Sequence, residues 1–403
     1  MNEPASLVAE PRSGQAPQHH HHTNESQDLI ILKGASTSPD PVVAVAELYE
    51  AIYHPDAALT IIYCSPSYDL DQLAAELHQR FAGTNMVGAT TAGEITPIGY
   101  LDGALTGVTL AGPAIRAEST RIDVLEHFNF ASGDDAAARL LQRVGEREPA
   151  TGANTFAFLL VDGLSRQEEM LVAALYRSLG EIQLFGGSAG DGTRFDTTYI
   201  YHDGAFRAGS AVFTLVQTSL PFEVFKTEHF VATDKKMVVT EAIASERIVT
   251  EINGEPAARE YARAVGVPVD TLNPLSFATH PVVVTVGDVT YVRSIQKVNP
   301  DESLTFFCAI DVGIVLTIAR GVDMVANLRE AFEGITRRLG PPTLVLGCDC
   351  ILRNIEAKQR GLIPEIGRLM QDNNVIGFAT YGEQFNGMHA NQTFTGVAIG
   401  AGG

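Results

Sequence analysis

The sequence contains no tryptophan, few other aromatic residues and only four cysteines in 403 residues. A chain so poor in aromatic side chains must build its core mainly from aliphatic residues. The cysteines, at positions 64, 308, 348 and 350, do not form the pattern of a disulfide-stabilised secreted domain. Cys348 and Cys350 alternate on one expected strand, which is not the spacing of a CxxC metal site, and we interpret both as small apolar residues of that strand.

Positive charge is also scarce. The chain has 28 Lys and Arg against 48 Asp and Glu, a net charge of −20. This balance speaks against nucleic acid and against an anionic membrane surface, because both attract basic proteins. No apolar run is long enough to cross a bilayer, and the first residues lack the basic and apolar regions of a signal peptide. We therefore expect a cytoplasmic protein that binds neither nucleic acid nor membrane.

The length favours two domains. Residues 1–27 are rich in Pro, Ser, Gln and Ala and carry four consecutive histidines, His19 to His22, which predicts a disordered tail. The remaining chain is expected to divide near Leu220-Pro221 into domains of residues 28–220 and 221–403.

One short pattern occurs three times. A small hydroxyl residue is followed by Ala or Tyr, then Gly, then an acid, in Thr91–Glu94, Ser188–Asp191 and Thr380–Glu383. Each of these kernels comes after an apolar strand and a helix-like segment, and before a polar arm and a second apolar strand. Such long-period self-similarity indicates duplicated units. It predicts an α/β fold of two related domains, built from repeated β-α-β-β units with mixed sheets flanked by helices. The half from Pro221 is expected to hold one clear unit and one diverged unit.

The third arm has the highest density of polar and aromatic groups. Loops on a rigid frame often carry function, so this arm is a candidate ligand site. The simpler interpretation of each kernel is that glycine is the residue a tight turn needs. The arm contains Tyr381, Glu383, Gln384, Phe385, Asn386, His389, Asn391 and Gln392.

No set of catalytic residues emerges. The sequence lacks a GxSxG elbow, a Walker loop, an HExxH motif and a GxGxxG after a strand, so we do not expect an enzyme. One minor alternative is a Cys350 thiolate activated by the nearby Arg353. His202 and His389 each lie in the polar arm of a repeat, where a neutral imidazole is able to bind a haem iron. A lone loop histidine is more often a hydrogen-bonding residue.

Several motifs, in order along the chain, resemble the FIST family of bacterial intracellular sensors. The segment Gly377–Phe385, followed by Met388-His389 and Asn391–Gly396, is similar to the end of the FIST C domain. The element Cys350–Arg353 resembles the Cys-x-x-Arg element of the same domain. Gly88–Glu94 and Phe185–Gly192 resemble the loops of the FIST N domain. The resemblance covers about residues 28 to 400.

The resemblance implies a stand-alone sensor, and one branch of the family is similar to nitric-oxide-sensing haem proteins of the NosP type. For this chain it implies haem b, with His389 as the first choice of iron ligand and His202 as the second. It also implies a partner histidine kinase or a cyclic-di-GMP enzyme (a diguanylate cyclase or phosphodiesterase), and a homodimer is possible. The expected cofactor-binding residues are His389, His202, Tyr381, Gly382, Glu383, Phe385 and Arg353.

Two alternatives remain open at this point. The first is a sensor of small metabolites without haem, in which Tyr381, Glu383 and Arg353 line a pocket for an amino acid. The second is an enzyme that uses Cys350 as its nucleophile.

Overall fold

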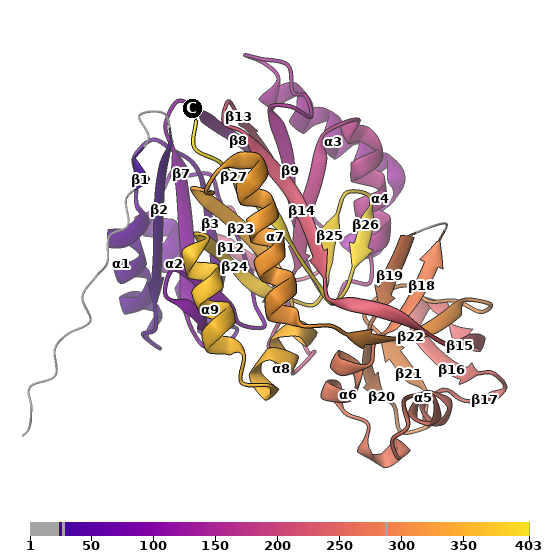
Figure 1. Cartoon of the computed structure of the whole chain (residues 1–403). Helices are drawn as coiled ribbons and strands as arrows, with labels where there is room; N and C mark the ends of the chain where they lie inside the picture. Colours follow the sequence, from indigo (N-terminus) through magenta and orange to yellow (C-terminus); the bar gives the residue numbers. More distant parts are fainter. Residues whose placement is uncertain (1–23, 26–28, 287–288, 403) are drawn as a thin grey trace, which may run out of the picture.

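The computed structural model describes residues 24–25, 29–286 and 289–402. The fold is mixed α/β, with several mixed sheets flanked by helices in two domains, which confirms the predicted fold class. The predicted tail, residues 1–27, lies outside the described residues except for the short strand β1 (Asn24–Glu25). In Figure 1 the larger domain holds helices α1 to α4 and α7 to α9, and the smaller domain, with α5 and α6, lies below it to the right.

Three units of the same construction make up the larger domain. The first contains β2 (Ile30–Ser36), α1 (Pro41–Ile52), β3 (Ala57–Cys64), α2 (Leu70–Arg80), β4 (Met86–Thr90), β5 (Glu94–Thr96), β6 (Gly99–Leu101) and β7 (Leu105–Ala111). The second contains β8 (Ile115–Ile122), α3 (Phe130–Val144), β9 (Thr155–Val161), α4 (Glu168–Leu179), β10 (Gln183–Ser188), β11 (Ile200–His202), β12 (Ala205–Arg207) and β13 (Ala211–Thr218). The third contains β14 (Phe222–Glu228), α7 (Met324–Leu339), β23 (Leu344–Cys350), α8 (Ile351–Gln359), α9 (Ile363–Asp372), β24 (Val375–Thr380), β25 (Glu383–Phe385), β26 (Met388–Ala390) and β27 (Thr393–Ile399).

The predicted strand–helix–strand order of each unit is confirmed. Strand β3 pairs in parallel with β4, β9 with β10 and β23 with β24, and a parallel pair needs a crossover such as the helix that joins each one. In the third unit the crossover is broken into α8 and α9. The break lies around Gly361, between the end of α8 at Gln359 and the start of α9 at Ile363. The φ of Gly361 is +68°, a value that glycine adopts readily and that does not continue a helix.

The units exchange their arms in a ring. The arm β5–β6 of the first unit joins the sheet of the third, β11–β12 of the second joins the sheet of the first, and β25–β26 of the third joins the sheet of the second. Each sheet therefore contains strands from two units. The three units depend on one another for complete sheets, which ties residues far apart in sequence into one domain.

The three sheets pack their inner faces together around one core. Aliphatic residues and a few rings from all three fill it, including Leu59, Phe158 and Leu346, each essentially without solvent exposure. The helices cover the outer faces: α1 and α2 lie on the first sheet, α3 and α4 on the second, and α7 and α9 on the third (Figure 1). Both faces of the central strands are buried, which explains why strands such as β3, β9 and β23 are apolar along most of their length.

The smaller domain is inserted between β14 and α7 of the third unit. Within residues 230–286 and 289–321 every described strand pair is antiparallel, so this segment is not the diverged βαβ unit that was expected there. The chain turns at Asn253-Gly254, where both residues have positive φ, 54° and 82°. The elements are β15 (Phe230–Ile243), β16 (Ile248–Ile252), β17 (Glu255–Pro256), α5 (Ala257–Val265), α6 (Pro274–Thr279), β18 (Val282–Val286), β19 (Val289–Arg293), β20 (Ile295–Val298), β21 (Leu304–Phe306) and β22 (Val315–Gly321), with 3-10 turns at Ala244–Glu246 and Val269–Thr271. A further 3-10 turn, Leu125–His127, lies between β8 and α3 of the second unit.

The predicted boundary near Leu220-Pro221 falls between β13 and β14, where the second unit ends and the third begins. As a boundary between two domains of residues 28–220 and 221–403, it stays a prediction.

Candidate functional site

The three glycine kernels meet at the centre of the larger domain and bond to one another. The backbone N–H of Gly190 donates to the Thr90 oxygen (2.9 Å), that of Ala92 to the Ala379 oxygen (2.9 Å), and that of Ser188 to the oxygen of Gly382 (2.8 Å). Each kernel thus holds the kernel of a neighbouring unit. The simpler interpretation of these turns, as parts of the scaffold, explains their backbone contacts.

The carboxyl groups of Glu94 and Glu383, in the first and third kernels, accept hydrogen bonds from the residues where their own arms end. An oxygen of Glu94 accepts from the Ala104 N–H (3.0 Å), and an oxygen of Glu383 accepts from the N–H (3.2 Å) and the hydroxyl (2.8 Å) of Thr393. In each case the other oxygen contacts a threonine hydroxyl three residues earlier. Burial raises the pKa of Glu94 to about 7 and that of Glu383 to about 8. Glu383 is therefore largely a neutral acid inside the scaffold.

The middle kernel is bound to Tyr381 of the third. The Tyr381 hydroxyl donates to Asp191 and lies 2.8 Å from the Gly192 oxygen. Burial opposes the ionisation of Asp191, but bonds from Tyr381 and from three backbone N–H groups lower its pKa. The ring of Tyr381 packs beside Phe195 and Phe307, at centroid distances of 4.8 and 5.9 Å.

His389 is buried where the third arm meets the smaller domain. Burial lowers its pKa to about 4, against the opposing effect of Glu169. Its Nδ1 lies 3.4 Å from the Nε2 of Gln384, and its Nε2 has no hydrogen-bond partner among the described residues. The ring lies against Gly382, where an added Cβ would come within 2.2 Å of the imidazole. The third arm is therefore packed into the protein and does not lie on open solvent.

The remaining residues predicted with His389 have partners elsewhere. Arg353 is fully buried, and its guanidinium donates to Asp349 (2.6 Å) and to the Nδ1 of His229 (2.7 Å). Phe385 is half-buried against the central core. The structure thus gives Arg353, Glu383 and Tyr381 separate sets of partners and does not turn them toward one common cavity.

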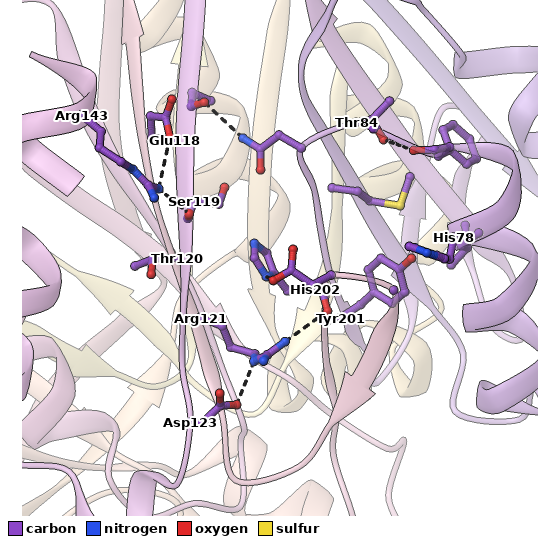
Figure 2. Close-up of a pocket in the computed structure, with 18 residues that line it drawn as sticks. His78, Thr84, Glu118, Ser119, Thr120, Arg121, Asp123, Arg143, Tyr201 and His202 are labelled. Atoms are coloured by element: carbon purple, nitrogen blue, oxygen red, sulfur yellow. Dashed lines mark hydrogen bonds and ion pairs between the residues drawn. The ribbon is translucent and has the colours of Figure 1, made fainter. Parts of the chain in front are cut away.

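The largest described cavity lies elsewhere, at the join between the first two sheets (Figure 2). Its volume is about 720 Å³, and it opens between β8, the end of α2 and the turn that joins β11 to β12. Leu77, Phe81, Met86 and Tyr201 supply apolar groups to its lining. Figure 2 shows Arg121 and Arg143 on the β8 side, with His202 between them and Tyr201.

His202 brings a neutral imidazole to this cavity. Its side chain is 11% exposed, and burial lowers its pKa. Its Nδ1 lies 3.0 Å from the Oδ2 of Asp203, a close contact that does not meet hydrogen-bond geometry. A carboxylate beside Nδ1 favours the tautomer that keeps its proton there and leaves the Nε2 lone pair free. Of the predicted histidines, His202 is the one that lines a described cavity.

The two arginines are anchored by residues around the cavity. Arg121 donates to Asp123 (2.8 Å) and to the backbone oxygen of His202 (3.4 Å). Arg143 donates to the Ser119 oxygen (2.8 Å) and pairs with Glu118 at 3.1 Å. A guanidinium has five N–H donors, so each retains donors for an anionic group in the cavity.

The repeat shows what is special about His202. The register of the three arms places His202 where the third unit has Phe385 and the first has Thr96, because the preceding arm residue pairs in each case with a glycine of the host strand. Phe385 packs on the core and lines a different cavity of about 490 Å³, whereas His202 faces the largest described one. The difference between His202 and its counterparts, Phe385 and Thr96, is visible in the sequence when the three arms are aligned in this register. Arg121 and Arg143 have no local sequence signal and were missed.

A second, smaller cavity lies between the two domains. It has a volume of about 330 Å³ and is lined by Phe195 and Arg166 of the larger domain and by Phe307, Arg247 and Lys297 of the smaller one. The guanidinium of Arg247 forms ion pairs with Glu168 (2.7 Å) and Glu169 (2.5 Å), the first residues of α4. The rim also carries two exposed acids, Asp196 and Glu246.

Cys350 does not have the surroundings of an activated thiol. It is 1% exposed, and burial raises its pKa well above the ordinary value. The nearby Arg353 directs its guanidinium to Asp349 and His229. The thiol is therefore protonated and enclosed, which removes the basis of the nucleophile hypothesis.

Two family models match successive segments of the chain. The FIST N domain model matches residues 58–255, and the FIST C domain model matches residues 257–386. Together the two models cover most of the chain, so the protein belongs to the FIST family, as the sequence motifs indicated. FIST domains are sensory ligand-binding domains and not catalytic ones, and the protein is accordingly a signal-transduction sensor of small ligands.

A comparison with curated proteins gives no match. Within the described part of the chain, no helix combines the length and the apolar character needed to cross a membrane.

Proposed function

We propose that this FIST protein is a haem-based nitric oxide sensor whose haem occupies the 720 Å³ cavity of Figure 2, with His202 as the iron ligand. The observation that carries the proposal is a neutral histidine, with a carboxylate beside its Nδ1, on the wall of the largest described cavity. His389, the first choice from sequence, is supported less well, because its ring is packed against Gly382 and lines none of the described cavities.

The lining fits the two chemical parts of haem b. Phe81 and Met86 provide apolar contacts for part of a flat ring, while Arg121 and Arg143 provide cations for its two carboxylates. When bound, haem would supply an iron atom able to take a diatomic gas. The chain itself would favour one tautomer of His202 through Asp203 and position the carboxylates through the two arginines.

We also propose that the signal leaves by protein contact, with a histidine kinase or a cyclic-di-GMP enzyme as the partner. The family resemblance supports this part. The partner must bind the gas-bound and gas-free forms with different affinity, since a ligand shifts an equilibrium only by its differential binding. A homodimer is compatible with this scheme and stays a prediction.

The test is absorption spectroscopy of protein purified with haem supplied. We expect a Soret band in the wild type and in His389→Ala, and its loss in His202→Ala. His127→Ala is the matched control, because this histidine is largely exposed and is not among the residues that line the cavity. A Soret band lost in His389→Ala and kept in His202→Ala would return the ligand to His389. If the wild type does not bind haem stoichiometrically, the haem proposal fails.

A second candidate is a sensor of amino acids at the cavity between the domains. The observation that favours it is the presence of both charges on the rim: Arg166 and Lys297 for a carboxylate, Asp196 and Glu246 for an ammonium group. The residues first predicted for this role, Tyr381, Glu383 and Arg353, are not among its lining. A thermal-shift screen with the common amino acids tests it. A rise in the unfolding midpoint that Arg166→Ala abolishes would support it, and no rise with any amino acid would exclude it.

A further inference from the structure

The smaller domain is attached to the larger one through two adjacent chain crossings. The chain enters it at His229, between β14 and β15, and leaves it at Val322, between β22 and α7. The N–H of Val322 donates to the backbone oxygen of His229 (2.8 Å), so the two crossings are bonded to each other. Such a pair of strands is a hinge about which an inserted domain can rotate, unless something fixes it.

The side chain at this hinge is completely buried and bonded at both ring nitrogens. The His229 Nδ1 lies 2.7 Å from a guanidinium nitrogen of Arg353, and its Nε2 lies 3.1 Å from the Oε2 of Glu356. Arginine only donates, so Nδ1 must accept, and Nε2 then carries the proton and donates to the carboxylate. Burial lowers the pKa of His229 to about 4, and this neutral tautomer is therefore present at neutral pH.

The contacts continue from the hinge into the scaffold. Arg353 donates to Asp349 at the end of β23 (2.6 Å), and Asp349 also accepts from the hydroxyl of Tyr100. Tyr100 lies in β6, part of the arm that the first unit places in the third sheet. On the other side, Glu356 pairs with Arg360 at 3.1 Å. One connected set of polar groups thus runs from an exchanged arm to the hinge.

The helix that carries Arg353 and Glu356 also contacts the smaller domain. Ile351 and Leu352 of α8 pack in one apolar cluster with Ala278 of α6 and with Phe307. Hence α8 contacts both the hinge and the body of the inserted domain. Burying this many charged groups costs more than burying apolar groups of the same size, and such sets are retained in some proteins because they select one arrangement.

We infer that His229, Arg353 and Glu356 form a latch at the hinge, which together with the ion pairs of Arg247 fixes the orientation of the smaller domain relative to the three-unit domain. His229 is a positioning residue in this arrangement: its neutral ring accepts from one partner and donates to the other, and it thereby joins α8 to the hinge. A displacement of α8 or of the exchanged arm is passed to the smaller domain through this ring. The latch residues line none of the described cavities, and their bonds do not depend on which ligand is bound.

Hydrogen exchange of the full chain, read by mass spectrometry, tests the latch through three variants. His229→Ala removes both bonds. His229→Gln retains an acceptor and a donor on one planar group, as in the neutral imidazole. Arg338→Ala is the control, because it breaks a bidentate ion pair with Glu223 that is also in the third unit but exposed. We expect peptides covering residues 228–231 and 320–323 to exchange about tenfold faster in His229→Ala, and near the wild-type rate in the other two variants.

The pattern of exchange separates a latch from ordinary packing. Peptides from β9 and from the core of the smaller domain should stay protected in His229→Ala, because the latch holds two folded parts together. Three results would overturn the inference: hinge peptides as slow in His229→Ala as in the wild type, equal acceleration in the Ala and Gln variants, or acceleration throughout the chain.

Discussion

The most direct test of the scaffold is the replacement Glu383→Gln. The wild-type acid is buried and its pKa is raised to about 8 from 4.5, so the folded protein holds a proton that the unfolded chain releases above about pH 5. Stability is therefore retained below the unfolded pKa and is lost as the pH rises toward 8. At about 1.4 kcal/mol for each unit of pKa difference, the rise from 4.5 to about 8 corresponds to roughly 4 to 5 kcal/mol of stability lost across this pH range.

Glutamine mimics the protonated acid. Its oxygen can accept from Thr393 as Glu383 does, and its amide can donate to the hydroxyl of Thr380. We expect Glu383→Gln to be about as stable as the wild type near pH 5, and more stable by at least about 2 kcal/mol near pH 8. Glu365→Gln, at an exposed ion pair, is the control without such a difference.

Urea unfolding at a series of pH values measures this difference directly. Glu94, with its pKa raised to about 7, contributes a slope of the same sign to both proteins, so the comparison isolates Glu383. A variant whose stability differs from the wild type by the same amount at every pH would refute the reasoning, because the carboxyl would then be ionised alike in both states.

Three further results are expected. Gly382→Ala should cost about 1 to 3 kcal/mol in urea unfolding, since its Cβ would come 2.2 Å from the ring of His389, and His389→Ala should recover most of that loss in the double variant; additive losses would argue against the clash. Arg247→Ala should cost about 3 kcal/mol or more, because it leaves Glu168 and Glu169 without their buried cation, and unchanged thermal unfolding would contradict this. Cys350 should react with a thiol reagent only as fast as the protein opens, and labelling faster than local exchange would show that the thiol is accessible.

The sequence by itself determined the repeated construction and the family. The three kernels, each preceded by an apolar strand and a helix, are local patterns, and the structure confirms the parallel strand pairs that they imply. The order of motifs from Gly88 to Gly396 was enough to indicate FIST domains, which the family models match. Patterns of this kind depend on neighbours in sequence, so they can be recognised from the sequence without the structure.

Only the tertiary structure decided where each side chain of interest lies. The arms join the sheets of other units, so Tyr381 meets Asp191 and Arg353 meets His229, partners between 124 and 190 positions away. The same exchange buries His389 and places His202 beside a cavity whose other wall belongs to β8. Contacts between distant segments depend on how the three sheets pack around the common core. The repeated sequence pattern does not determine which sheet each arm joins.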